Sequence, residues 1–71
     1  MIPANEVAVL AELYDRFANA LDPFSPDRDA AEQRFYLKLE ELYIRHAPTV
    51  MFSEFRREAV RQCKLFLKKN R

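Results

Sequence analysis

The sequence contains no glycine, and this absence narrows the choice of fold at once. Glycine readily adopts the positive φ angles of tight β-hairpin turns, so a β protein of this composition would have to build its turns from a few Asn and Asp residues. Phosphate-binding loops of the glycine-rich type are excluded outright. Four prolines punctuate the chain instead, and together these features favour helices joined by proline-marked loops.

Cysteine and histidine are scarce as well, because Cys63 and His46 are the only residues of their kinds. One cysteine cannot form an intrachain disulfide and is typical of a reducing compartment, and the two residues together cannot provide the ligands of a structural zinc from one chain. A nucleophile pair of Cys63 and His46 is formally possible, but both lie on apolar stripes, where such residues usually pack in a core. We therefore expect no cofactor, metal, small-molecule substrate or catalytic site, and hence no enzyme.

Long apolar runs are missing too. No segment approaches the ~20 apolar residues of a membrane span. The first residues carry Glu6 and Glu12 and have no Lys or Arg ahead of their apolar positions, which argues against a signal peptide. We expect a cytoplasmic protein without membrane association.

The core material that is present suits one small domain. The chain has 71 residues, of which 49% are apolar and 13% aromatic, so a single domain over residues 1–71 is expected. At this size a core rarely supplies more than about 3 to 5 kcal/mol, and small folds usually add a disulfide, a metal or a partner chain. Since the first two are not expected, the length itself suggests a partner.

Apolar periodicity predicts three amphipathic helices, over about residues 3–21, 26–46 and 53–69. Ser25 is a good N-cap for the second helix and Ser53 for the third, while the second helix should end before Pro48. The predicted fold is all-α: an antiparallel helical hairpin plus a third helix, assembled as a homodimeric helical bundle. The predicted core stripes are Val7, Leu10, Ala11, Tyr14, Phe17, Ala18 and Leu21 in the first helix, Ala31, Phe35, Leu39, Leu42 and His46 in the second, and Phe52, Phe55, Ala59, Val60, Cys63, Phe66 and Leu67 in the third.

The second helix has a further apolar stripe, nearly opposite its core stripe. Ala30, Leu37 and Ile44 recur at intervals of seven residues on the side where a surface helix should be polar. Two explanations are open. These side chains are either scattered exposed apolar residues, which are common, or one continuous seam for association with another helix. The spacing favours the seam, and we expect a homodimer with Ala30, Leu37 and Ile44 in its interface, another protein being the alternative partner.

Charge is unevenly distributed although its formal total is only +1. Residues 53–71 hold seven Lys or Arg and two Glu, a net charge of +5. Residues 1–52 hold five Lys or Arg and nine Asp or Glu, a net charge of −4. Arg57, Arg61, Lys64 and Lys68 form a basic stripe that could follow a phosphate backbone. It could instead complement the acidic part of its own or a partner chain, which is the preferred explanation because the chain as a whole is nearly neutral, or be a solvated surface. The resulting prediction is a small non-enzymatic interaction module that self-associates, with nucleic-acid binding as the alternative.

Overall fold

Three helices form the part of the chain that the computed structural model describes, residues 2–46 and 49–70. They are α1 (Ala4–Ala18), α2 (Pro26–His46) and α3 (Phe52–Lys69), and no strand occurs within those two ranges. The expected all-α class and the three helical segments are confirmed. Pro48, before which the second helix was predicted to end, lies outside the described residues.

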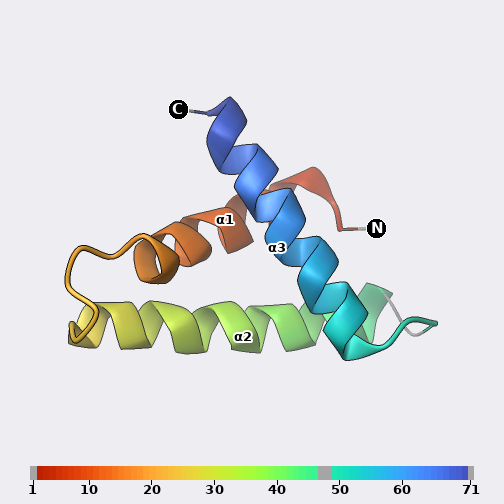
Figure 1. Ribbon diagram of the computed structural model, residues 1–71. Helices are drawn as coiled ribbons and strands as arrows, with labels where there is room; N and C mark the ends of the chain where they lie inside the picture. The colour runs from red at the N-terminus through yellow and green to blue at the C-terminus, as the bar shows by residue number, and fades with distance from the viewer. Residues whose placement is uncertain (1, 47–48, 71) are drawn as a thin grey trace.

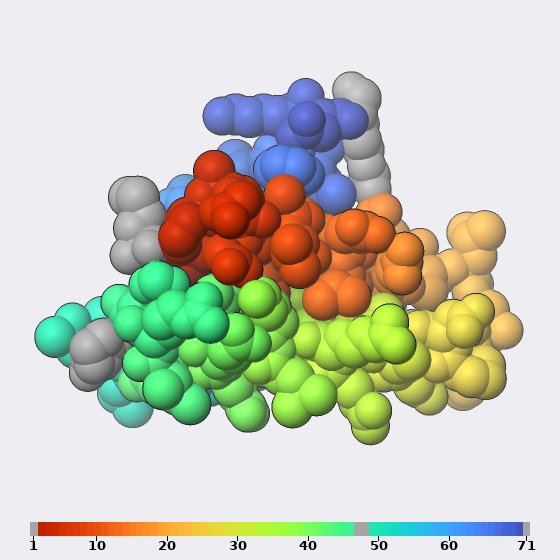
Figure 2. Space-filling model, turned by 180° about the vertical axis from the view of Figure 1, so that it is seen from behind, coloured from red at the N-terminus to blue at the C-terminus, as the bar shows by residue number. Residues whose placement is uncertain are grey.

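Helix α1 packs against both other helices and holds the fold together. It runs antiparallel to α2 (Figure 1), with Glu6 near its start in contact with Lys38 and Phe17 near its end in contact with Phe35. Helix α3 crosses α1 steeply and meets α2 mainly near its own first turn (Figure 1). The predicted antiparallel hairpin with a third helix is therefore confirmed. Because α1 and α3 both approach α2 from one side, the opposite side of α2 is left uncovered (Figure 2).

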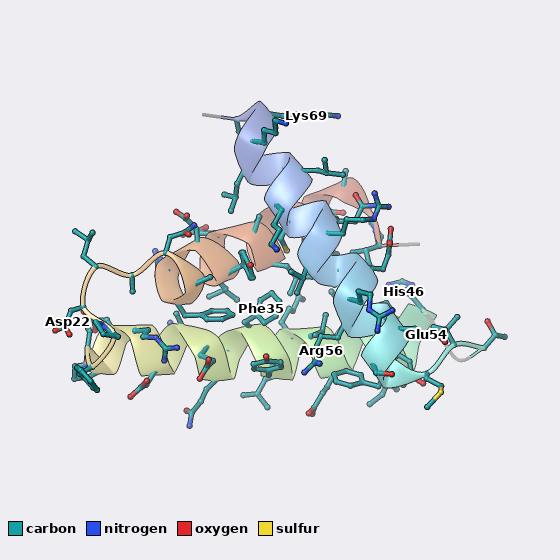
Figure 3. The ribbon with its side chains drawn as sticks, in the orientation of Figure 1. Asp22, Phe35, His46, Glu54, Arg56 and Lys69 are labelled. Carbon is teal, nitrogen blue, oxygen red and sulfur yellow. The ribbon has the colours of Figure 1, made fainter. Side chains whose placement is uncertain are left out.

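The core contains one apolar stripe from each helix. Phe35 lies between α1 and α2 (Figure 3), within a ring cluster that also contains Tyr14, Phe17 and Tyr36. A second ring cluster, of Tyr43, Phe52 and Phe55, joins α2 to α3. Full burial of such a side chain contributes roughly 1.5 to 3 kcal/mol, so these stripes are the main source of stability. The buried apolar residues are Ile2, Val7, Leu10, Ala11, Ala31, Phe35, Leu39, Leu42, Phe55, Ala59 and Cys63.

The start of α2 has the predicted cap, whereas the start of α3 does not. The Asp27 N–H donates to Ser25 Oγ at 3.2 Å, which confirms Ser25 as the N-cap. The third helix was expected to begin after Ser53, but α3 begins at Phe52 and no side chain caps it. The start is set by packing instead: the rings of Phe52 and Tyr43 lie 5.3 Å apart, and the Tyr43 hydroxyl donates to the Val50 carbonyl at 2.5 Å.

Three predicted core positions, Ala18, Leu21 and His46, are exposed in the structure, and their assignment to the core is wrong. Leu21 was expected on the core stripe of a helix ending near residue 21, but α1 ends at Ala18, which is itself exposed, and Leu21 is fully exposed. Asp22 precedes Pro23, which disfavours a helical backbone there. His46 was also expected in the core, yet it is exposed, since Glu6 pairs with Lys38 and the last turn of α2 therefore extends beyond the start of α1.

One ion pair between helices was not anticipated from the sequence. Lys38 Nζ lies 3.1 Å from Glu6 Oε2, and these side chains retain only 24% and 18% of their exposure. A pair this sheltered from solvent is less screened than a fully exposed one. It joins the first part of α1 to the middle of α2.

Candidate protein interaction surface

The uncovered side of α2 forms an apolar stripe with polar borders, which we call the outer face. Its apolar residues are Ala30, Leu37 and Ile44, all exposed, with Leu37 at 66% and Ile44 at 80%. The helix runs unbroken from Pro26 to His46, so side chains seven residues apart lie almost in line along it. Its buried residues, including Phe35 and Leu39, lie on the other side. The structure thus places the three predicted interface residues together on one exposed face.

Charged and amide side chains border the apolar stripe on both sides. Glu41 accepts from Arg45 at 2.6 Å and has Lys38 Nζ at 3.6 Å, and both contacts end on its Oε1 atom. Arg34 is exposed, and no ion pair to it occurs within residues 2–46 and 49–70. Gln33 and Glu40 are exposed on the other border. The outer face therefore offers both hydrogen-bond donors and carboxylates around an apolar centre.

A shallow hollow of about 450 Å³ lies beside Leu37. Its wall consists of Leu37, Tyr36 and polar side chains one turn away on the same helix: Glu32, Gln33 and Glu40. It is open to solvent and is formed by α2 alone. A hollow between residues of adjacent helical turns is the shape that receives a side chain from a facing helix.

More exposed apolar side chains lie at the two ends of α2, and sequence reasoning missed them. Phe24, which immediately precedes the Ser25 cap, is 89% exposed; Val50 and Met51, which precede α3, are 39% and 69% exposed. They lie in loops, where helical periodicity gives no signal. Only the packing of the three helices shows that nothing within the described chain covers them.

The basic stripe of α3 is exposed, but one of its cations is already neutralised. Arg61 donates to both carboxylate oxygens of Glu58, at 2.9 and 2.5 Å. These hydrogen bonds, with a further one from Gln62, lower the pKa of Glu58 to about 2, and the same contact raises the pKa of Arg61. Arg57, Lys64 and Lys68 are exposed as expected. The stripe therefore presents three cations and one ion pair to solvent.

The two candidate nucleophilic residues occupy different environments. Burial raises the pKa of the Cys63 thiol to about 11, so the reactive thiolate is scarce near neutral pH. His46, in contrast, is exposed beside Glu54 at the far end of α2 (Figure 3).

Across the described residues, no group of three or more His, Cys, Asp or Glu could hold a metal ion. None of the helices in this part of the chain has the length and apolar character that a membrane span requires. No protein-family model, curated protein or solved structure matches the chain.

Proposed function

We propose that this chain is a non-enzymatic protein–protein interaction module that self-associates through the outer face of α2. The observation that carries the proposal is the exposure of Leu37 and Ile44, at 66% and 80%, in line on a helix whose opposite side supplies buried core residues. Contiguous exposed apolar surface with a polar border is characteristic of sites that bind another protein. A second copy of the same chain presents the same surface, and closed two-fold dimers are the commonest assemblies of this kind.

The exposed apolar residues of the other helices make a useful contrast. Val9 on α1 and Leu65 on α3 are 46% and 41% exposed, and each lies alone on its helix. Single exposed residues of this kind are ordinary and need no partner. Leu37 and Ile44 are more exposed than either and share one continuous face. This difference supports an association surface over scattered exposure.

The small size of the fold supports the same proposal. The 71-residue chain contains one cysteine, which is buried and free, so no disulfide supplements its core. Helices α2 and α3 also meet mainly at one end of α2, so the rest of α2 packs chiefly against α1. A dimer through the outer face would cover α2 on both sides and add apolar burial that one chain cannot provide.

The basic stripe supports nucleic-acid binding less well. Affinity for a phosphate backbone increases with the number of cations that are free to neutralise phosphates, and Glu58 already neutralises Arg61. The chain as a whole is also close to neutral, whereas nucleic-acid-binding domains of this size are usually much more basic.

The mass of the protein in solution tests the proposal. Sedimentation velocity over a wide range of concentrations should show a species of twice the 8.4 kDa chain mass, with its population rising with concentration. The parent should also melt at a higher temperature when it is more concentrated, because dimerisation stabilises the folded chain by mass action. A single 8.4 kDa species and a concentration-independent melting temperature would contradict the proposal.

A further inference from the structure

The two borders of the outer face differ in a way that distinguishes the possible orientations of two packed helices. At 100° per residue, Arg34 and Glu41 lie roughly 60° and 40° to one side of Leu37. Gln33 and Glu40 lie about 40° and 60° to the other side. All four side chains are exposed. One border therefore carries a cation and an anion one turn on either side of Leu37, and the other carries an amide and an anion.

A two-fold axis through Leu37 brings different borders together in the two orientations. In an antiparallel pair, each border faces the same border of the second copy with its direction reversed. Arg34 of each copy then lies level with Glu41 of the other copy. Gln33 of each copy lies level with Glu40 of the other copy. In a parallel pair, opposite borders meet at the same level, so Glu40 lies level with Glu41 of the second copy. Like charges across a helix pair repel, whereas opposite charges set its orientation.

The apolar stripe and the ends of α2 favour the same orientation. An antiparallel pair matches the small Ala30 with the larger Ile44 of the second copy, so each layer has a similar volume; a parallel pair matches alanine with alanine and leaves a gap. Antiparallel packing also places the acidic first turn of one helix, with Asp27 and Asp29, beside the basic last turn of the other, with Arg45. The two helix dipoles are then opposed, which is favourable.

From this complementarity we infer that two copies of α2 pack antiparallel, with Leu37 on the two-fold axis and Arg34 paired with Glu41 of the second copy. The inference rests on the proposed self-association and specifies its geometry. Glu41 can accept this further partner because its two contacts within the chain both end on Oε1. The same orientation brings Phe24 at the start of one α2 to the end where Val50 and Met51 of the second copy are exposed.

Charge-reversal variants test the pairing. Arg34→Glu and Glu41→Arg each create two repulsive pairs in the antiparallel dimer, and we expect each to weaken self-association about tenfold or more. An equimolar mixture of the two variants restores both pairs and should form a mixed dimer. Glu40→Arg is the matched control, because residue 40 faces Gln33 and should change the affinity little. Circular dichroism checks that each variant remains helical.

The outcomes separate the geometry from the self-association. In a parallel dimer Glu41→Arg and Glu40→Arg would both tighten association, since each removes a carboxylate pair; that result overturns the antiparallel inference and leaves the proposed function standing. If the protein dimerises and Arg34→Glu leaves the affinity of the dimer unchanged, the inference is overturned in the same way. A parent protein that is monomeric at every concentration overturns the inference and the proposed function together.

Cysteine cross-linking gives a second test that does not depend on charge. In the antiparallel dimer the two copies of residue 30 lie about 21 Å apart along the helix axis, so Ala30→Cys alone should not cross-link. A mixture of Ala30→Cys and Ile44→Cys should cross-link as a mixed dimer. Efficient disulfide formation by Ala30→Cys alone shows a parallel pair and overturns the inference. The parent is the negative control, because Cys63 is buried.

Discussion

The double substitution Leu37→Glu and Ile44→Lys gives the sharpest test of the outer face. Both side chains are exposed in the single chain, at 66% and 80%, so their replacement should change the stability of the monomer by no more than about 0.5 kcal/mol. Any larger loss of stability has to come from association. The variant also places a charge on each apolar layer of the proposed interface without changing the net charge of the chain.

The size of the effect follows from the exposed fractions. Complete burial of a Leu or Ile side chain contributes roughly 1.5 to 3 kcal/mol. About two-thirds to four-fifths of that contribution is still to be gained at these positions when a partner chain covers them. Two residues from each of two chains therefore supply about 4 to 9 kcal/mol before the cost of association. That cost is similar in size, so the stripe alone gives at most a weak dimer and the polar borders contribute the remainder. Loss of even the lower figure corresponds to about a thousandfold increase in the dissociation constant.

Sedimentation velocity and thermal unfolding measure the two consequences. At a concentration where the parent is dimeric, the variant should sediment as an 8.4 kDa species and melt at a lower temperature, near that of the diluted parent. The matched control is Val9→Glu with Leu65→Lys, which introduces the same two charges on exposed apolar positions of α1 and α3 and should retain the dimer. If the outer-face variant kept the mass and melting temperature of the parent, Leu37 and Ile44 would be ordinary exposed surface.

Three further predictions concern the cap, the cysteine and the basic stripe. Ser25→Ala should lower the free energy of unfolding by about 0.5 to 2 kcal/mol, because it removes the acceptor of the Asp27 N–H, whereas Ser25→Asp should retain most of it; equal urea midpoints for parent and alanine variant would contradict the capping role. Cys63 should resist thiol reagents at pH 8 in the folded protein and react on unfolding. Because burial raises its pKa from 9.0 to about 11, the folded chain holds a proton that the unfolded chain loses, so this contribution to stability is complete below about pH 9 and is lost as the pH rises through about 11; stability that increases over this interval would contradict it. Duplex DNA at low salt should bind weakly or not at all, and Lys64→Glu with Lys68→Glu should change nothing measurable; salt-sensitive binding that these substitutions abolish would support the nucleic-acid alternative instead.

The sequence alone determined the features that depend only on residues within a few turns of one helix. The lack of glycine, the proline positions and the apolar periodicity were enough to predict the all-α class and most of the three core stripes, because periodicity depends only on the geometry of a single helix. Ser25 was identified as a cap for the same reason: it acts on an N–H two residues away. The exposed stripe of Ala30, Leu37 and Ile44 was also visible, since two opposite faces of one helix cannot both pack against neighbours that approach from the same side.

The features that only the tertiary structure decided depend on residues far apart in the chain. The steep crossing of α3 over α1 follows from which side chains fit together, and it determines that α2 and α3 meet mainly at one end. The packing of α1 on α2, which brings Glu6 to Lys38, leaves the last turn of α2 beyond α1 and His46 exposed. The contact of Phe52 with Tyr43, and not the Ser53 hydroxyl, sets the start of α3. Each of these outcomes is a competition between a local preference and burial against a distant segment, and burial of an aromatic ring outweighs a capping bond worth about 1 kcal/mol.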